Sequence, residues 1–250
     1  LFSALLMGTT IWKFWGYAQD RTAEYIALDI LNSLPAHSIL VMDRDTPLFT
    51  TQYVRYVERV RTDVIVLHGS RLSFPDYRDT VSRLFPVLNM PQTEDDEFMK
   101  KFFTENVAKA PVFSYMKYSL GPDWFWVPHG IVYQLFPKDK LPLVSEMKRD
   151  NLRIWEAAHD PSSGILSRYN HLMLSDVRDV YTSARVEFGK TVMRSGDLNT
   201  AKDQFLAAIA YGGDAQLADA YTYAGLTDLF LHDCDGALLN FEKAKRASFT

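Results

Sequence analysis

The sequence predicts an α/β fold that is followed by an all-α region. In residues 19–142, short apolar runs without polar–apolar alternation recur between helical patterns. Such runs are typical of strands covered on both faces, and their alternation with helices predicts a three-layer domain with a mostly parallel sheet. After residue 142 only helical periodicity remains. The length of 250 residues is sufficient for both regions.

The composition is that of a globular protein and excludes several functional classes. Hydrophobic residues make up 47% and charged residues 23%, which argues against a disordered chain. The net charge of −4 and the lack of a Lys/Arg cluster predict no nucleic-acid partner. A single cysteine, Cys234, excludes an internal disulfide and a cysteine-based metal cluster. Its alignment with Leu198 in the repeats described below predicts a packed side chain rather than a nucleophile.

The N-terminal segment is strongly apolar. Residues 1–18 carry one charge, Lys13, and a membrane-spanning helix needs about 20 apolar residues. Trp12, Trp15 and Tyr17 fit the aromatic belt at the exit from a membrane. We therefore predict that this segment is the end of a transmembrane helix. A buried N-terminal helix and the remnant of a signal peptide are the alternatives.

Residues 19–142 contain four helical patterns and four short apolar runs. Each helical pattern ends at turn residues or at a proline. The predicted helices are residues 22–34, 48–60, 74–85 and 94–108, and the predicted strands are residues 38–42, 63–67, 111–115 and 130–136. We expect a Rossmann-like arrangement of layers. The strand-to-helix turns contain no glycine-rich phosphate-binding loop, so we predict neither a nucleotide nor any other cofactor.

An aromatic segment, Trp124-Phe125-Trp126, lies between the third and fourth predicted strands. It fits a sugar-stacking or membrane-facing loop, because an exposed apolar patch marks an interaction site. It equally fits a cover over one edge of the sheet. The sequence leaves both interpretations open.

The polar turn after the first predicted strand is the candidate ligand site. Asp43 and Asp45 lie there, and ligands of open α/β sheets bind beyond the carboxyl ends of the strands. Two carboxylates suit a divalent cation or a sugar hydroxyl. His68 follows the second strand and is expected near Asp43. The structural alternative is that Asp45 or Thr46 caps the next helix, Asp43 pairs with an arginine and His68 is hydrogen-bonded within the fold.

The sequence predicts no catalytic residue and no metal site. The six histidines include no closely spaced pair of the kind that binds zinc. Neither a serine nor the cysteine lies in a Gly-x-Ser-x-Gly turn, where a hydrolase would hold its nucleophile.

Residues 181–250 repeat themselves at an offset of 36. The matching pairs are Ala184/Ala220, Gly189/Gly225, Thr191/Thr227, Asp197/Asp233, Ala201/Ala237, Phe205/Phe241 and Ala208/Ala244. This order of small and large residues resembles that of tetratricopeptide repeats, in which alanines let two helices approach and a phenylalanine fills the gap between them. We predict a helical linker over residues 143–180, followed by two tetratricopeptide-like repeats of a truncated array.

Short motifs between residues 22 and 77 resemble a known family. They are Ser33-Leu34-Pro35, the strand 39–42, Asp43-x-Asp45-Thr46-Pro47, Tyr53-Val54-Arg55-Tyr56, Val60-Arg61-Thr62-Asp63-Val64 and Tyr77. In this order they resemble the soluble C-terminal tail of multi-spanning membrane proteins related to protein O-mannosyltransferases. Where the family has a glycine, a proline and a tryptophan, this chain has Met42, Thr62 and Asp76.

The resemblance implies a lipid-phosphate-sugar-dependent glycosyltransferase of the GT-C type. Its catalytic acidic residue would lie in a loop between membrane helices, so none is assigned to this chain. The resemblance further implies a membrane-anchored domain on the extracytoplasmic side. Its partners would be the upstream transmembrane domain of the same polypeptide, the membrane and a polypeptide acceptor.

We expect an accessory function, positioning or binding the acceptor, because repeat arrays commonly offer a concave protein-binding surface. Two alternatives remain open. One is a repeat-containing scaffold without transferase activity. The other is a sugar-binding or hydrolase domain that uses Asp43 and Asp45.

Overall fold

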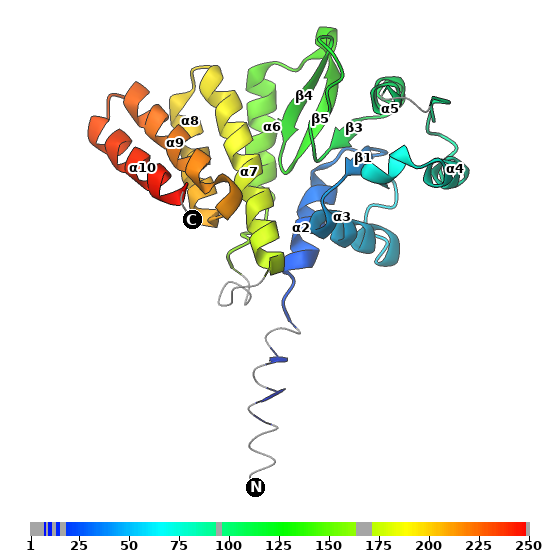
Figure 1. Ribbon diagram of the computed structural model, residues 1–250, viewed down its shortest axis with the longest axis horizontal. Helices are drawn as coiled ribbons and strands as arrows, with labels where there is room; N and C mark the ends of the chain where they lie inside the picture. The colour runs from blue at the N-terminus through cyan, green and yellow to red at the C-terminus, as the bar shows by residue number, and fades with distance from the viewer. Residues whose placement is uncertain are drawn as a thin grey trace.

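The computed structural model describes residues 19–93, 97–163 and 172–248, together with Gly8, Thr10, Ile11, Phe14 and Trp15. In this part of the chain a five-stranded sheet carries helices on both faces and is followed by two helical hairpins (Figure 1). The predicted α/β fold class is thereby confirmed.

The predicted elements of the first region are present, with shifts of a few residues at their ends. The helices are α2 (Thr22–Ser33), α3 (Asp45–Gln52), the π-helical turn η1 (Tyr53–Val57) that continues α3, the 3-10 turn η2 (Ser70–Ser73), α4 (Pro75–Leu84), α5 (Phe98–Asn106) and the 3-10 turn η3 (Lys138–Lys140). The strands are β1 (Ile39–Met42), β2 (Ile65–His68), β3 (Val112–Ser114), β4 (Trp124–His129) and β5 (Val132–Pro137).

The sheet is mixed, with the strand order β2-β1-β3-β5-β4. β2, β1 and β3 are parallel, whereas β3, β5 and β4 pair antiparallel, so the prediction of a mostly parallel sheet was wrong. The reason is the aromatic segment, which forms the edge strand β4 instead of a loop. Only Gly130 and Ile131 connect β4 to β5, and so short a connection permits only an antiparallel hairpin.

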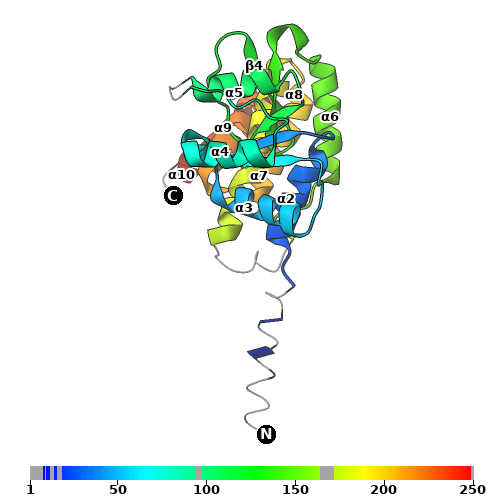
Figure 2. The same ribbon diagram turned by 90° about the vertical axis from the view of Figure 1, so that its right-hand side faces the viewer.

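The two faces of the sheet belong to different apolar cores. Leu40 and Met42 of β1 face a core that they share with α2, α3 and the later helices. Ile39 and Val41 face a second core that includes residues of α4 and α5. Figure 2 shows α4 and α5 in front of the strands on that side. The three layers are therefore helix, sheet and helix, and β1 is buried along its whole length.

A buried asparagine fixes the β4–β5 hairpin to α6 (Val144–Ala157). Asn151 Oδ1 accepts the N–H of Gly130 at 2.8 Å, and its Nδ2 donates to the carbonyls of Pro128 at 2.8 Å and Met147 at 2.9 Å. Gly130 has φ 59°, a conformation that glycine adopts without strain. One side chain thus satisfies both sides of the hairpin turn.

The all-α region forms two helical hairpins. They consist of α7 (Leu172–Arg194) with α8 (Leu198–Tyr211), and α9 (Asp214–Phe230) with α10 (Cys234–Ala247). A Cβ on Gly189 would lie 2.6 Å from Cε1 of Phe205, and one on Gly225 would lie 2.8 Å from Cε1 of Phe241. The internal repeat is therefore also a repeat of contacts. That these hairpins are tetratricopeptide repeats stays a prediction.

The helix starts repeat as well. The Asp197 carboxylate accepts the N–H of Thr200 at 3.1 Å at the start of α8, and the Asp233 carboxylate accepts the N–H of Gly236 at 2.9 Å at the start of α10. Aspartate is a preferred residue at this position because it pairs one of the free N–H groups of the first turn.

α7 joins the two regions. Val177, Val180 and Tyr181 pack in the same core as Leu40 and Met42 of β1. The predicted linker, residues 143–180, therefore contains α6 and the first part of a helix that continues into the first hairpin. The predicted boundaries at residues 142 and 180 stay predictions.

The predicted transmembrane segment, residues 1–18, lies mostly outside the described residues. Of its members that are described, Ile11, Phe14 and Trp15 are each more than 60% exposed. Across the described ranges, every helix is too short or too polar to cross a bilayer.

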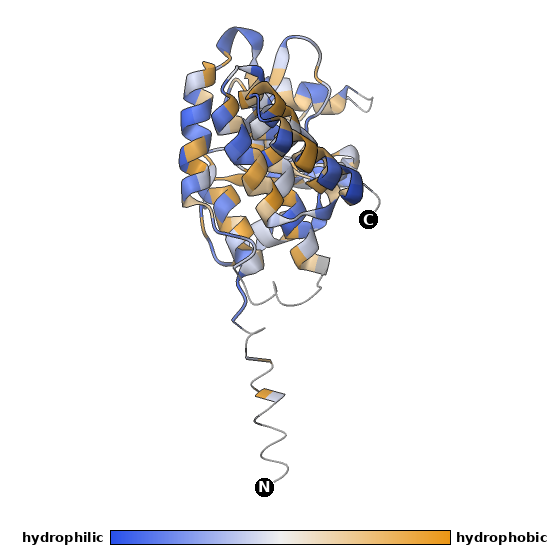
Figure 3. Ribbon diagram, turned by 90° about the vertical axis from the view of Figure 1, so that its left-hand side faces the viewer, coloured by the Kyte–Doolittle hydropathy of each residue, from blue (hydrophilic) through white to orange (hydrophobic). Residues whose placement is uncertain are grey.

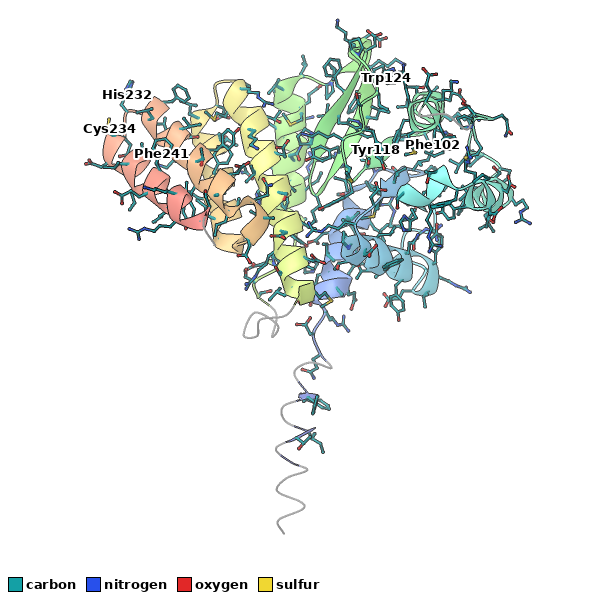
Figure 4. All side chains as sticks on the ribbon, in the orientation of Figure 1. Phe102, Tyr118, Trp124, His232, Cys234 and Phe241 are labelled. Carbon is teal, nitrogen blue, oxygen red and sulfur yellow. The ribbon has the colours of Figure 1, made fainter. Side chains whose placement is uncertain are left out.

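Cys234 is exposed at the first turn of α10, so the prediction of a packed thiol was wrong. Figure 4 shows it next to His232 at the free end of the second hairpin. The repeat aligns it with Leu198, but α8 is followed by another hairpin, whereas α10 is the last helix that the structure describes.

Candidate functional site

The carboxyl ends of the parallel strands meet where the sequence predicts a site. The register of β1 and β2 pairs Met42 with His68. The N–H of Gly69 donates to the carbonyl of Met42 at 2.8 Å, which extends this pairing by one residue. Asp43 therefore follows β1, and His68, which was predicted just beyond the second strand, is the last residue of the neighbouring strand β2.

The Asp43 carboxylate is closely enclosed. Tyr118 Oη donates a hydrogen bond to its Oδ2, and any side chain at Gly69 would overlap the carboxylate. Burial, reinforced by the nearby Asp43, raises the pKa of Tyr118, so the hydroxyl keeps its proton. Tyr118 and Phe102, both labelled in Figure 4, belong to the core on the α4–α5 side of the sheet. The predicted pairing of Asp43 with an arginine was wrong, since its partner is a tyrosine 75 positions later.

The rest of the turn binds α7. Arg44 Nη2 donates to Asp176 Oδ1 at 2.9 Å and lies 3.4 Å from Asp179 Oδ2, and Thr46 Oγ1 donates to Asp176 Oδ2 at 2.7 Å. Burial lowers the pKa of the Arg44 guanidinium, but hydrogen bonds to Tyr115 and Asp176 outweigh burial and raise it. This turn therefore ties the sheet to the hairpins.

The remaining predicted site residues do not join Asp43 in one polar group. Asp45 is exposed in the first turn of α3, and neither it nor Thr46 caps that helix through its side chain, which corrects the capping alternative. His68 Nδ1 lies 3.2 Å from Ser70 Oγ, and its ring meets the ring of Phe49 edge to face. Among the described residues, no three His, Cys, Asp or Glu side chains are grouped so as to hold a metal ion.

Arg61, which contributes to the family resemblance, has a structural role. Its guanidinium donates to the carbonyls of Leu31 at 2.7 Å, Leu34 at 2.8 Å and Pro35 at 2.9 Å, at the end of α2. It also forms an ion pair with Asp63 at 2.9 Å. The hydrogen bonds from Arg61 hold the pKa of the Asp63 carboxyl well below its usual range. This part of the motif therefore caps the end of α2.

A cavity of about 440 Å³ opens between α2 and α6, and the sequence analysis did not predict it. Its titratable lining residues are Asp29, His129, Asp150, Arg153 and His159. Asp29 accepts hydrogen bonds from the ring and backbone of His159, at 2.6 and 2.9 Å, and from Tyr181 Oη. His129 Nε2 lies 2.7 Å from the carbonyl of Ser33, and burial lowers the pKa of this imidazole. Asp29 and His129 thus take part in hydrogen bonds that join α2 to α7, to β4 and to His159.

Exposed apolar side chains form a first surface on α3 and η1. Phe49, Tyr53 and Val57 are 54%, 55% and 63% exposed, and their spacing of four places them along one side of the continuous helical segment. We call these three residues the α3 stripe.

A second exposed apolar surface surrounds the connection between α9 and α10. Leu229, Phe230, Leu238 and Leu239 are between 48% and 62% exposed. We call these four residues the hairpin tip. Figure 3 shows hydrophobic colouring on the first part of α10 and hydrophilic colouring toward its C-terminal end. Apolar patches of this kind mark interaction sites more often than the isolated apolar residues of an ordinary surface.

One curated protein is similar to part of this chain. Neither a family model nor a solved structure matches the chain. The chain is 25% identical over 149 residues to the protein O-mannosyl-transferase tmem260 of Dictyostelium discoideum. It is related to a glycosyltransferase. The similarity covers 54% of this chain and 18% of that protein, so the chain spans a small part of its relative's length.

Proposed function

We propose that this chain is the extracytoplasmic accessory domain of a membrane-embedded, O-mannosyltransferase-like glycosyltransferase, and that its hairpins bind the polypeptide acceptor. The similarity to a protein O-mannosyl-transferase supports the first part. The exposed hairpin tip supports the second part. In this proposal the upstream transmembrane domain of the same polypeptide carries out the transfer.

The hairpin tip has the chemistry to bind an extended peptide segment. Each leucine or phenylalanine that becomes buried contributes about 1.5–3 kcal/mol, so four such residues are sufficient for a specific contact. The last turns of α10 add the exposed cations Lys243, Lys245 and Arg246. We therefore expect the hairpins to prefer acceptors in which apolar and acidic residues surround the hydroxyl that receives the sugar. That the hairpins are tetratricopeptide repeats, which commonly bind peptides, belongs to the same proposal.

The geometry favours this function over a sugar-binding or hydrolase domain. Asp43 is enclosed by Tyr118 and Gly69, while Asp45 faces solvent on α3. A structural use of this turn is supported by the hydrogen bond that Asp43 receives from Tyr118.

The test is the binding of a fluorescent serine- and threonine-containing peptide with leucine and glutamate neighbours, measured by anisotropy. We expect the double variant Leu238→Ser/Leu239→Ser to bind it at least about ten-fold more weakly than the unchanged chain, a loss of about 1.4 kcal/mol. The matched control is Phe49→Ser/Tyr53→Ser, which removes equally exposed residues from the α3 stripe and should bind normally. Equal binding by both variants, or none by the unchanged chain, would contradict acceptor binding.

The full-length protein separates this function from that of a scaffold without transferase activity. There the Leu238→Ser/Leu239→Ser variant should raise the KM for the polypeptide acceptor and leave the KM for the sugar donor unchanged. Absence of any sugar transfer by the full-length protein would favour the scaffold.

A further inference from the structure

The α3 stripe is the apolar surface that acceptor binding does not use. Its helix is firmly attached to the fold: Leu48 and Val54, on the inner side, are 0% and 1% exposed. Tyr56 Oη donates to the carbonyl of Val66 at 3.1 Å, and Arg55 Nε donates to the carbonyl of Val64 at 2.6 Å. The stripe is therefore the exposed outer side of a helical segment whose inner side is fixed in the core.

The residues of the stripe and their neighbours suit the interface between lipid and water. Aromatic side chains gather at the headgroup level of membranes, and arginine can bury its stem while its charge stays in water. Arg59 is exposed, with no ion pair among the described residues, and Arg55 lies over the ring of Tyr56 at 4.9 Å. Asp45 and Glu58 balance these charges, so the contact needs no anionic lipid.

The position of the stripe also points to a membrane. α3 lies at the same end of the molecule as the start of α2, in both views (Figures 1 and 2). The exposed apolar residues Ile11, Phe14 and Trp15 lie seven to eleven positions before the start of α2 in the sequence. A bilayer beside the start of α2 would face both sets of apolar side chains at once, whereas the hairpin tip lies at the opposite end.

We propose that the α3 stripe lies in the headgroup region of a lipid bilayer, with the axis of α3 parallel to the membrane surface. Exposed aromatic side chains such as Phe49 and Tyr53 are of the kind that gathers at the headgroup level of a membrane. The proposal goes beyond acceptor binding and rests on the proposed function only in placing the chain beside a bilayer. It assigns the two exposed apolar surfaces to different partners.

The experiment uses an environment-sensitive fluorophore on single cysteines in a Cys234→Ser background, with phosphatidylcholine vesicles whose acyl chains are brominated. Labels go on Tyr53→Cys and Val57→Cys, and the controls are Leu239→Cys and Leu238→Cys. Each control has nearly the same exposure as its counterpart, 53% against 55% and 62% against 63%. We expect a blue shift and quenching at positions 53 and 57 only, and we expect both to persist at high salt.

Equal responses at all four positions, or none at positions 53 and 57, would overturn the proposal. A blue shift at those positions that appears only when the transmembrane domain is present, and without quenching by brominated lipid, would also overturn it. A protein surface would then cover the stripe. Peptide binding measured without vesicles keeps the two proposals separate. If positions 53 and 57 are not quenched but the chain binds the peptide, only the lipid contact is refuted. If they are quenched but the chain does not bind the peptide, only acceptor binding is refuted.

Discussion

The hairpins cap their helices with neighbouring residues, whereas the sheet region caps α2 with a distant one. α8 and α10 each begin with an aspartate whose carboxylate pairs an N–H three residues later. The carbonyls at the end of α2 instead receive their hydrogen bonds from Arg61, which lies 27 and 30 positions beyond Leu34 and Leu31. The local cap depends only on residues next to the helix, so it recurs in both hairpins. The cap of α2 depends on one residue that is distant in the sequence.

The same contrast holds for packing. In each hairpin a glycine leaves room for a phenylalanine ring, so the same packing contact occurs twice. The β4–β5 hairpin depends on Asn151 of α6, a contact that is not repeated elsewhere among the described residues. Substitutions in the sheet region should therefore cost more free energy of unfolding than equivalent substitutions in the outer hairpin.

The largest effect is expected for Asn151→Leu. This change leaves the N–H of Gly130 and the carbonyl of Pro128 without a partner in a buried site, and each such group costs about 1–3 kcal/mol. We expect the free energy of unfolding, measured with urea, to fall by about 3–5 kcal/mol. Asn199→Leu, at an exposed position of α8, should change it by less than about 0.5 kcal/mol. A loss below about 1 kcal/mol for Asn151→Leu would show that the hairpin does not depend on this side chain.

Gly189→Ala and Gly225→Ala compare the two hairpins directly. The new methyl group would lie against Phe205, which is fully buried, or against Phe241, which is partly exposed and can move. Overpacking a buried site costs about 1–3 kcal/mol, so we expect Gly189→Ala to destabilise by about 2 kcal/mol. Gly225→Ala should cost less, about 1 kcal/mol, because the ring of Phe241 is partly exposed and alanine favours a helix, while the methyl group still approaches the carbonyl oxygen of Ala237. Thermal unfolding of both variants measures the difference, and equal losses would mean that the hairpins are equally rigid.

The smallest difference in the free energy of unfolding is expected between the two kinds of helix cap. Arg61→Ala removes hydrogen bonds to three carbonyls at the end of α2, and we expect a loss of about 2 kcal/mol in urea unfolding. Asp233→Ala, a local cap, should cost about 1 kcal/mol. Arg59→Ala is the control, since Arg59 shares the positive φ of Arg61 and has no ion pair among the described residues. Should Arg59→Ala prove as costly as Arg61→Ala, backbone strain rather than capping would explain the loss.

The contrast also explains what the sequence could predict. The hairpins and the first three strands follow from periodic or contiguous patterns, which depend on neighbouring residues only. The edge strand β4 was missed because it contains Pro128 and alternates weakly, and its pairing with β5 decides its structure. Topology correctly placed Asp43 and His68 at one edge of the sheet. Their actual partners were not predictable, because nothing in the local sequence marks Tyr118 as the hydrogen-bond donor to Asp43.

α7 has a consequence for how the two apolar surfaces are presented. It contains 23 residues and therefore extends over about 35 Å. It runs from the end of the molecule where α2 starts to the end where the second hairpin turns (Figure 1). Arg44 and Thr46 bind its first turns, so its tilt is fixed against α3. If the α3 stripe contacts lipid and the hairpin tip binds the acceptor, as we propose, α7 is the rigid helix that sets the distance between the bilayer and the bound polypeptide.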